Sequence, residues 1–564
     1  MDNSKNIKVC IILDSIKCPW YIYDIINWLQ SQKNIQFNGI IIQSTKTEKN
    51  LFLKLIKAIS EKKVIKLFNG LIIKLIYFLE KKIILIKNKT YIKYFLAYDL
   101  SNYKIKKIYI KNLKSNNNEN YYNKNDILKI KKLKLDIIIR GGSGILKGEI
   151  LKSSKYGIIS FHHGDNKIYR GGPPGFWEVF YENSCTGFII QQLTEQLDGG
   201  NVIFSGHFKT KTSYVFNQIA LFERSNFFFK KIILYIQKKK KLPYFKINYP
   251  YYNRIFSNPN IFQLFKYIKN MITRKLFNFI KVRLINEVWN IGYHHKNFNN
   301  LTLYNSKKIK NPKGSFLADP FIMKYKNKNY IFTEEYNFNL KKGLIAVYKI
   351  NEIGYKKIGI AIKEDFHLSF PYIFKFNKKF YLIPESSENK DIRLYECLNF
   401  PLKWKLKKIL FKNINAVDSI ILYHKKIWWL LTNISKTNDI PDSEFNIFYS
   451  KKGPITNKWV SHPENPILLN PLNSRNAGLI KVDDSIYRIS QSPDFYTYGK
   501  SLNINKIIKL NTVQYNEKIV SNIKANFSKE AKAIHHLDSK NNLTVFDYCT
   551  KNMKINFFNL FNNR

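Results

Sequence analysis

Cysteine, proline and glycine are scarce in this chain, which has only 5 Cys, 17 Pro and 23 Gly among 564 residues. So little Gly and Pro excludes a collagen-like chain and a flexible linker protein. The five cysteines are scattered, odd in number and without CxxC spacing, so we expect neither a disulfide framework nor a zinc cluster. A reduced, cytoplasmic compartment fits this pattern best.

Long uncharged apolar runs are missing as well. The most apolar stretch, residues 67–86, is interrupted by four charged side chains, so it predicts one or two amphipathic helices and no membrane span. The apolar segment 9–13 near the amino terminus is followed by an acidic residue and has no small-residue cleavage site, which argues against a secretory signal.

Acidic residues are few: 40 Asp and Glu stand against 94 Lys and Arg, a formal net charge of +54. Such an excess would suit a nucleic-acid partner, because Lys and Arg neutralise phosphates. The lysines are spread along the chain, however, and accompany abundant Ile, Asn, Phe and Tyr, whose codons are rich in A and T. We therefore attribute the charge to genome composition and expect no nucleic-acid partner. The hydrophobic content of 45% argues against global disorder.

The first half of the chain alternates between strand and helix patterns, which predicts an α/β domain with a parallel sheet. We expect a strand at 8–13, a helix at 20–32, a strand at 39–43, helices over 50–95, a solvated loop at 112–125 and a strand at 135–139.

A helix is expected at 212–241, ending in the four lysines 238–241, which indicate a solvated helix end more than a phosphate site. A Tyr/Pro/Asn-rich connector and a further helix to about residue 285 follow. The predicted domains are 1–235, a helical connector 236–285, and 286–564.

The second half repeats one pattern: an apolar strand, a polar turn and an aromatic-rich strand. The copies start at 318, 369, 416, near 475 and near 531. A period of about fifty residues is the size of a four-stranded propeller blade, so five copies predict an all-β five-bladed propeller.

Residues 157–178 and 186–200 hold two His, two Asp, an Arg and several Gly, a set that is hard to explain as core. They resemble the formyltransferase catalytic-domain family, which carries Asn-x-His, then Arg-Gly eight residues beyond the His, and later Leu-Asp-x-Gly. His162, Arg170-Gly171 and the segment 197–200 match in order and spacing. The resemblance covers roughly residues 5–235 and implies a Rossmann-like formyltransferase domain.

The resemblance implies that an amine attacks the formyl carbon of 10-formyltetrahydrofolate. By this resemblance His162 stabilises the intermediate and shuttles the proton, and Asp198 holds the imidazole and a relay water. A satisfied loop histidine and an Asx turn are the structural alternatives for these two residues. Ser160 replaces the family Asn, so a neighbour must supply the amide donor or catalysis is impaired; of His163, Asp165 and Asn166, we hypothesise Asn166.

The folate-contacting residues implied by the resemblance are Gly141, Gly142, Ser143, Gly144, Ile145, Leu146, Thr194 and Leu197. The Gly run 141–144 follows a strand, where backbone can approach a ligand closely, although a plain turn would explain it too. The acceptor-binding candidates are His163, Asp165, Arg170, Gly171 and Gly172, and no metal is expected.

The propeller half resembles the five-bladed propellers of glycosidases and the amino-terminal domain of plant glucosamine inositolphosphorylceramide transferase. Its candidate groove holds Asp319, Glu334, Glu335 and Asp418. Glycosidic hydrolysis needs paired carboxylates, but the second blade offers Ser369-Phe370 at the matching place. We favour a saccharide-binding domain over a glycosidase or a purely structural module.

The combined hypothesis is a folate-dependent N-formyltransferase that acts on an amino sugar, nucleotide-linked or part of a glycan precursor. One rival is methionyl-tRNA formylation, although that enzyme carries a small barrel where this chain has a propeller. The other rival is a non-catalytic saccharide-binding protein whose transferase site has decayed, for which Ser160 is the motivating residue. The oligomeric state stays open.

Overall fold

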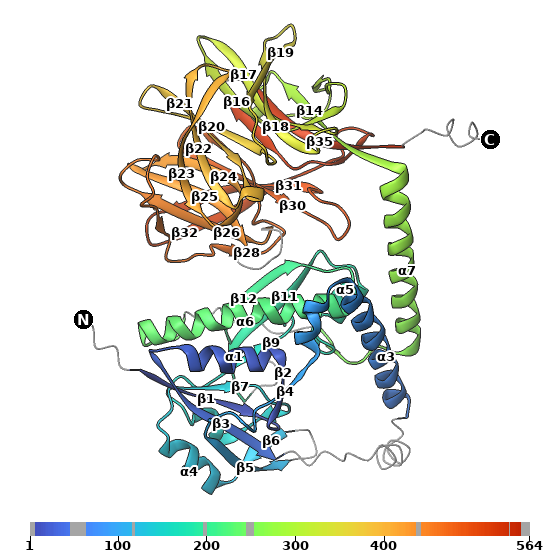
Figure 1. Ribbon diagram of the computed structural model, residues 1–564, viewed down its shortest axis with the longest axis vertical. Helices are drawn as coiled ribbons and strands as arrows, with labels where there is room; N and C mark the ends of the chain where they lie inside the picture. Colours follow the sequence, from blue (N-terminus) through green and yellow to red (C-terminus); the bar gives the residue numbers. More distant parts are fainter. Residues whose placement is uncertain are drawn as a thin grey trace, which may run out of the picture. The chain divides into compact units, whose positions relative to one another are not determined.

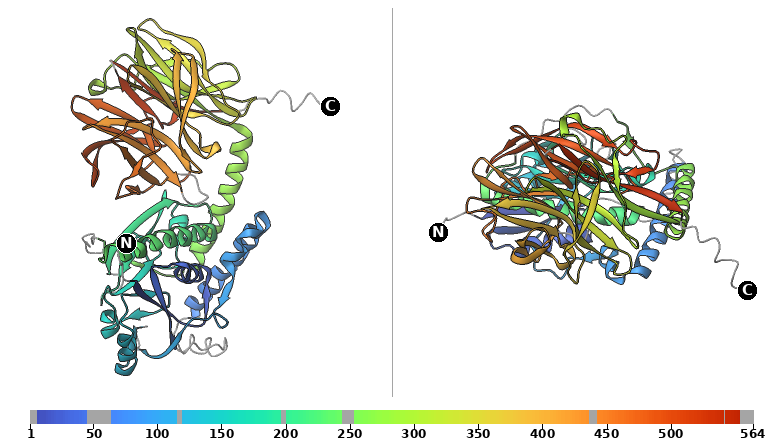
Figure 2. Two further views of the ribbon diagram at one scale, coloured as in Figure 1. Left: turned by 60° about the vertical axis from the view of Figure 1, so that its left-hand side comes forward. Right: turned by 90° about the horizontal axis from the view of Figure 1, so that it is seen from above.

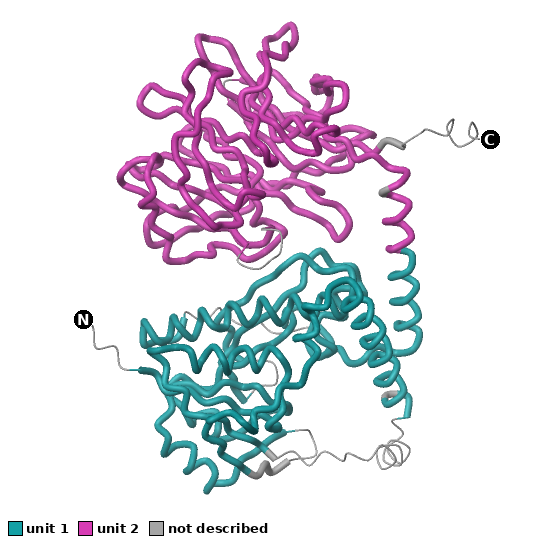
Figure 3. The backbone as a smooth tube through the Cα atoms, in the orientation of Figure 1, with its two compact units in different colours: residues 1–273 teal, residues 274–564 magenta. Residues whose placement is uncertain are grey.

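The computed structural model describes residues 6–44, 64–114, 119–195, 200–243, 253–435, 442–540 and 542–553. The chain divides into two compact units, residues 1–273 and 274–564 (Figure 3). The division falls inside helix α7 (Ile261–Leu284), within the segment that the sequence predicts as a connector. No helix in these described ranges is long and apolar enough to cross a membrane.

The first unit is built on a nine-stranded sheet whose centre is parallel (Figure 1). Strand β1 lies in the middle; β3 and β5 follow on one side, and β7 and β9 on the other. Their bounds are β1 (Ile7–Leu13), β3 (Ile35–Ser44), β5 (Lys107–Lys114), β7 (Ile137–Arg140) and β9 (Ile158–His162). The Ile-rich runs of β1, β7 and residues 40–42 of β3 are buried on both faces, as central parallel strands require, whereas Tyr109 of β5 is 65% exposed.

Both edges of this sheet depart from the parallel pattern. Strands β11 (Cys185–Gln192) and β12 (Asn201–Lys209) add antiparallel beyond β9, and β6 (Glu119–Tyr122) and β8 (Ile145–Leu146) extend the other edge. Two short pairs lie outside the sheet, β2 (Lys17–Pro19) with β4 (Ala97–Asp99) and β10 (Arg170–Gly171) with β13 (Ile255–Phe256).

Helices cover both faces of the sheet. On one face lie α1 (Trp20–Ser31) and α6 (Tyr214–Lys239), where Phe161 of β9 stacks on Phe229 at a ring separation of 4.2 Å. On the other lie α4 (Lys124–Lys132) and η2 (Gly148–Lys152), whose apolar residues share one core with β1 and β7.

A second helical cluster packs beside the amino-terminal end of α6. It comprises α3 (Val64–Lys87), η1 (Lys89–Phe95), α5 (Phe176–Phe180) and the first half of α7. Glu80 of α3 accepts hydrogen bonds from the Val215 N–H, at 2.8 Å, and from the Tyr267 hydroxyl of α7. Because the first N–H groups of a helix lack internal partners, Glu80 caps α6 from a neighbouring helix.

Most of the predicted elements of this unit are confirmed, including both of the strands at 8–13 and 39–43 and the helices at 20–32 and 212–241. The predicted loop at 112–125 is wrong, because β5 reaches Lys114 and β6 occupies 119–122. Its Asn and Lys content hid a strand in which Asn120 and Tyr122 point inward. The lysines 238–241 lie at the exposed end of α6, as expected.

The second unit is the predicted five-bladed propeller. Four blades are consecutive: β16–β19, β20–β23, β24–β28 and β29–β32. Their strands are β16 (Ser315–Tyr325), β17 (Lys328–Asn337), β18 (Lys342–Ile350), β19 (Tyr355–Ile362), β20 (Ser369–Phe376), β21 (Lys379–Glu385), β22 (Asp391–Asn399), β23 (Lys403–Lys412), β24 (Asn415–His424), β25 (Ile427–Ser435), β26 (Glu444–Ser450), β27 (Val460–Ser461), β28 (Leu468–Leu469), β29 (Asn476–Val482), β30 (Ser485–Ser492), β31 (Ser501–Leu510) and β32 (Tyr515–Lys524). Short 3₁₀ turns are η3 (Phe298–Asn300) and η4 (Ser387–Asn389).

The fifth blade joins the two ends of the propeller sequence. Its inner strands come last in the chain, β33 (Ala531–Ala533), β34 (Leu537–Lys540) and β35 (Leu543–Met553). Its outer strands come first, β14 (Ile285–His294) and β15 (Lys307–Ile309). The antiparallel β14–β35 pairing runs from Ile285 to His294 without interruption and therefore closes the ring.

A close contact inside this closing pair gives a stability test. Gly292 lies opposite Phe546, and a Cβ at Gly292 would come within 2.4 Å of Phe546 Cζ. We expect Gly292→Ala to lower the free energy of unfolding by about 1–3 kcal/mol, because the ring must move. Chemical denaturation followed by tryptophan fluorescence measures this.

The matched control is Gly354→Ala, since a Cβ there meets nothing within 4 Å and should cost little. In a Phe546→Ala background the cost of Gly292→Ala should largely disappear. An equal cost in both backgrounds would show that the ring is not the cause.

Candidate functional site

The carboxyl ends of β1 and β7 form the switch point of the parallel sheet. From β1 the chain builds outward through β3 and β5, whereas β7 and β9 build in the opposite direction. Open α/β sheets bind ligands in the crevice at such a point. The segment after β7, residues 141–144, is the predicted glycine-rich loop, so the sequence places it correctly.

The side chains around this loop hold its backbone. Buried Arg140 donates to the Gly144 carbonyl, at 3.1 Å, and to the Ser143 carbonyl. Gln43 and Asn120 also donate to the Ser143 carbonyl, at 3.0 and 2.9 Å, while the Ser143 N–H donates to Asp14 at 2.8 Å. The loop is therefore fixed by its own domain.

Two of the glycines are needed for this packing. A Cβ at Gly141 would lie 2.8 Å from Leu13, and one at Gly142 would lie 2.8 Å from the Asp14 carboxylate. The close backbone approach that the sequence suggests is thus made to neighbouring side chains. Farther on, Ile145 and Leu146 form β8, with Leu146 buried.

His162, Ser160 and Gln191 share one face of the sheet. Side chains alternate along β9, so Ser160 and His162 point the same way, and Gln191 of β11 lies directly opposite Ser160 in the register. Gln191 is 4% exposed, and its buried Oε1 has no hydrogen-bond partner among the described residues. A Cβ at Gly164 would lie 3.3 Å from His162 Nε2, so only a very small residue fits beside that nitrogen.

The neighbouring His163, predicted to bind the acceptor, points to the opposite face from His162. Its ring stacks on Phe161 at 5.3 Å and meets the edges of Tyr21 and Phe222 between α1 and α6. Burial, with a smaller contribution from His162, lowers the pKa of His163 to about 3, so the ring is neutral at physiological pH. His163 is a packing residue.

Asp165 forms an ion pair that the sequence does not reveal. Its carboxylate lies 2.9 Å from His207 Nε2 of β12 and also accepts the Lys167 N–H, at 2.9 Å. Burial alone would raise the pKa of Asp165, but the hydrogen bonds and charge of His207 outweigh it and lower that pKa. Gly187 makes room for this pair, since a Cβ there would lie 2.9 Å from both residues.

Gly171 and Gly172, predicted to bind the acceptor, pair instead with β13. Gly171 has a φ of +91°, and a Cβ there would lie 2.1 Å from the Phe256 carbonyl oxygen. The Gly172 N–H donates to that oxygen at 3.1 Å. Arg170 is partly buried at the start of this pair, and Asn166 is fully buried in the loop before it.

Leu197 and Asp198 lie outside the described residues, so their predicted roles stay predictions. Thr194 is described and partly buried, and the adjacent Glu195 accepts a hydrogen bond from the Gly148 N–H at 3.0 Å. This contact joins the segment before Asp198 to the segment after β8.

A pocket of about 470 Å³ opens beside β13. Trp177, which is otherwise part of the core, lies in its wall. The remaining lining residues are Ile65, Asn69, Arg254, Ile255, Phe256, Ser257, Asn258, Asn260 and Gln263.

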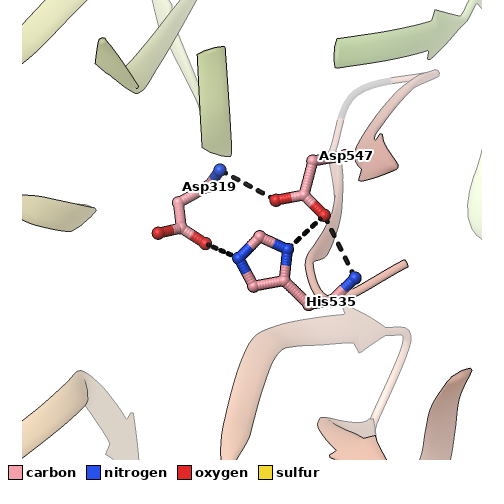
Figure 4. Close-up of side chains that lie close together, drawn as sticks. All are labelled: Asp319, His535 and Asp547. Carbon is pink, nitrogen blue, oxygen red and sulfur yellow. Dashed lines mark hydrogen bonds and ion pairs between the residues drawn. The ribbon is translucent and has the colours of Figure 1, made fainter. Parts of the chain in front are cut away.

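In the propeller, Asp319, His535 and Asp547 form a buried chain of ionisable groups (Figure 4). His535 Nδ1 lies 2.9 Å from Asp547, and its Nε2 lies 3.3 Å from Asp319. Asp547 also accepts the N–H groups of Asp319, His535 and His536, at 2.9–3.1 Å. The imidazole is thus held between two carboxylates.

Burial raises the pKa of Asp319 to about 7, against the opposing charge of His535. Burial alone would lower the pKa of His535, but Asp547 and Asp319 raise it above its usual value. A proton can therefore be shared along this chain near neutral pH. Three ligand atoms lie within 4.8 Å of one another, yet a metal ion would have to displace these hydrogen bonds.

A second group joins this chain from the third and fourth blades. Arg475 Nε lies 2.6 Å from Asp418, and its guanidinium lies 5.0 Å from the Tyr498 ring. Burial raises the pKa of Asp418 to about 7, with Arg475 opposing. Tyr498 and Trp289 flank His535 at ring separations of 5.3 and 3.9 Å, so the charged groups have two aromatic neighbours.

Of the four predicted groove acids, two belong to this cluster, a third, Glu334, lies within its electrostatic influence, and the fourth, Glu335, pairs elsewhere. Asp319 and Asp418 both occupy bulges of inner strands with a φ of +51°. Glu334 lies 3.6 Å from His367, and burial together with Asp319 raises its pKa well above the usual value. Glu335 points the other way along β17 and pairs with Lys357, 2.6 Å away, so its role in a groove stays a prediction.

Sequence reasoning missed His535, Asp547 and Arg475 as site residues. In the structure Asp319, Phe370, Asp418 and Gly478 share a positive φ near the start of the inner strand of four successive blades. His535, Asp547 and Arg475 do not share this feature, so the repeats alone would not have revealed them.

The raised pKa values predict a pH-dependent stability. Between about pH 4 and 7 folded Asp319 holds a proton that an ordinary Asp has released, so the folded state binds more protons than the unfolded state. The free energy of unfolding therefore falls as pH rises through this window. We expect Asp319→Asn to reduce that slope, measured by chemical denaturation from pH 5 to 7.5.

Glu335→Gln is the control, because its carboxylate pairs with Lys357 away from Asp319. An unchanged slope in Asp319→Asn would contradict the assigned proton.

Comparison with known proteins separates the two halves. The family described as glucosamine inositolphosphorylceramide transferase 1, N-terminal, matches residues 296–549. Glucosamine inositolphosphorylceramide transferase 1 from Arabidopsis thaliana is 34% identical over 223 residues, which is 38% of this chain and 28% of that protein. The rice (Oryza sativa subsp. japonica) protein of the same name is 31% identical over 240 residues, 40% of this chain and 31% of that protein.

Methionyl-tRNA formyltransferase from Bacillus subtilis is 37% identical over 79 residues, 14% of this chain and 25% of that protein. The chain thus spans less than a third of the length of each of these relatives. Among solved structures, the family 117 glycoside hydrolase Zg3597 from Zobellia galactanivorans aligns with 47% of this chain and 91% of that protein at 10% identity and a TM-score of 0.31, too low to support an inference. The propeller is similar in sequence to the N-terminal part of named plant transferases, and a shorter part of the chain is similar to methionyl-tRNA formyltransferases.

Proposed function

We propose that this protein transfers a formyl group from 10-formyltetrahydrofolate to the amine of an amino sugar. The observation that carries the proposal is the place of His162, at the carboxyl end of β9 on the face of Ser160 and Gln191. That place adjoins the switch point where α/β sheets bind ligands. The partial similarity to methionyl-tRNA formyltransferase supports the same chemistry.

When bound, 10-formyltetrahydrofolate would supply the activated formyl group. The residues fit a polar ligand here because Gln191 Oε1 is buried on this face without a partner among the described residues. The backbone of 141–146, together with Thr194 and Leu197, would hold the pterin. No metal is required by this reaction.

His162 would act as the proton carrier. An attacking amine must lose a proton, and the departing folate nitrogen must gain one, so one imidazole that accepts and then donates serves both steps. Asp198 would orient the imidazole.

Because Ser160 stands where the formyltransferase family has Asn, another residue must supply the amide donor. The two candidates are Asn166 and Gln191. Asn166 is the residue that the sequence favours, but the register favours Gln191, which lies across from Ser160 on the face of His162. We propose that the Gln191 amide stabilises the negative charge that develops on the formyl oxygen.

The propeller would bind the saccharide part of the acceptor. Its central cluster combines carboxylates, an arginine and two aromatic rings, Trp289 and Tyr498, a combination able to hydrogen-bond hydroxyls and stack on a sugar ring. The plant relatives, which are named glucosamine inositolphosphorylceramide transferase 1, support a glycan-related acceptor.

Two rivals remain to be separated. Methionyl-tRNA formylation is favoured by the name of the bacterial relative, and a non-catalytic saccharide-binding role by Ser160. We propose the cytoplasm as the compartment, since all five cysteines are free. A formyl-transfer assay decides among the three functions, with purified protein, 10-formyltetrahydrofolate and either a panel of amino sugars or methionyl-tRNA. Failure to bind the folate would leave only the non-catalytic role.

The two adjacent histidines give the sharpest test of the site. We expect His162→Gln to lower the rate of formyl transfer by about 10²–10⁴, the usual contribution of a general acid–base group. His163→Gln is the matched control and should keep the rate, because its ring packs on the other face. Equal losses in both variants would refute the assignment.

The amide donor is tested by single substitutions. We expect Gln191→Ala to lower kcat by about 10²–10³. Gln192→Ala is the control and should leave kcat unchanged. It alters the neighbouring side chain, which donates a hydrogen bond to the Tyr156 carbonyl. If Asn166→Ala shows the loss and Gln191→Ala does not, the donor is Asn166.

A further inference from the structure

Helix α3 carries an apolar stripe that no described part of the chain covers. Its inner face packs in the core through Ile73, Ile76 and Glu80, which are 7%, 4% and 3% exposed. The opposite face is apolar too. Its exposed members, 37–83% accessible, are Val64, Ile65, Phe68, Leu71, Leu75, Phe78, Leu79, Ile83 and Ile86.

These residues form a second face and are not scattered. Val64, Phe68, Leu71, Leu75 and Leu79 recur at steps of three or four, the spacing of one helix face. Soluble monomers rarely expose such a continuous apolar surface, which usually marks an interaction site.

The stripe continues on neighbouring elements of the same unit. Ile92 and Leu96, at the end of η1, are 45% and 47% exposed. The first half of α7 lies beside α3 through the Tyr267–Glu80 hydrogen bond (Figures 1 and 2) and exposes Phe262 and Phe265.

The charge around the stripe has one sign. Between residues 64 and 96 the only acidic residue is Glu80, which is buried, and residues 261–273 contain none. Exposed cationic side chains flank the stripe, and Lys82 lies 4.6 Å from the Phe78 ring, its stem covering apolar surface. They are Lys74, Lys82, Lys87, Lys89, Lys93, Lys266 and Lys269.

We propose that α3, η1 and the start of α7 dock on the surface of an anionic lipid bilayer. An apolar helix face enters the boundary between headgroups and acyl chains, while surrounding lysines contact anionic headgroups. Residues 64–96 and 261–273 contain no exposed carboxylate, so these segments lack the repulsion that acidic side chains would meet at an anionic bilayer. The helix lies on the membrane, because its inner face is committed to the protein core.

The test is sedimentation of the full chain with phosphatidylcholine vesicles, with and without phosphatidylserine. We expect binding that needs phosphatidylserine and weakens as salt is raised. Phe68→Ser/Leu75→Ser/Ile86→Ser should bind at least about 100-fold more weakly, because each change removes apolar area that would enter the bilayer. Lys74→Glu/Lys82→Glu/Lys87→Glu should lose binding as well.

A matched triple variant, Ile353→Ser/Leu398→Ser/Val513→Ser, removes exposed apolar residues of the propeller and should bind like the unchanged chain. Far-UV circular dichroism verifies that each variant is folded. Absence of binding by the unchanged chain, equal binding by the α3 variant, or light scattering that shows a dimer dissolved by the α3 changes would overturn the proposal.

Discussion

The propeller depends on one buried carboxylate. Asp547 accepts hydrogen bonds from three backbone N–H groups and from the His535 ring, and one of those N–H groups belongs to Asp319 in the first blade. A charge in a closed interior is costly unless such partners compensate it. Asp547 therefore joins the last strand to the first blade and at the same time orders the candidate site, so stability and chemistry share one group.

The first unit is governed by the alternation of side chains along a strand. His162 is the last residue of β9 and His163 follows it directly, so the two rings point to opposite sides, and the His163 ring packs between α1 and α6. The same rule separates Glu334 from Glu335 in the propeller. Adjacent residues of one type thus take unrelated environments, and the environment decides whether a titratable group can serve chemistry or packing.

Periodicity was enough to predict most of the architecture. Repeats of about fifty residues gave five blades in the correct places, and apolar runs gave the central strands of the sheet. The strand at 119–122 was missed because its Asn and Tyr residues lack an apolar pattern. His535, Asp547, His207 and Gln191 escaped prediction for a different reason: their neighbours Asp319, Asp165 and Ser160 lie on other elements, and only the folded arrangement brings these side chains together.

The glycine-rich segments meet a packing requirement of the fold itself. Gly141, Gly142 and Gly171 are needed where backbone approaches other atoms closely, but those atoms belong to the protein. Pre-formed loops of this kind lose little entropy when a ligand arrives, which favours binding to a rigid backbone.

The pairing of β14 with β35 also sets an order of events during synthesis. Residues 1–273 leave the ribosome well before the strand that completes the ring, so the α/β unit can fold while the propeller is still open. Until residues 543–553 emerge, β14 presents an unpaired edge directly after α7. The nascent chain therefore exposes the edge of β14 to wrong strand pairing while four blades are synthesised. Pairing of β35 with β14 ends that exposure.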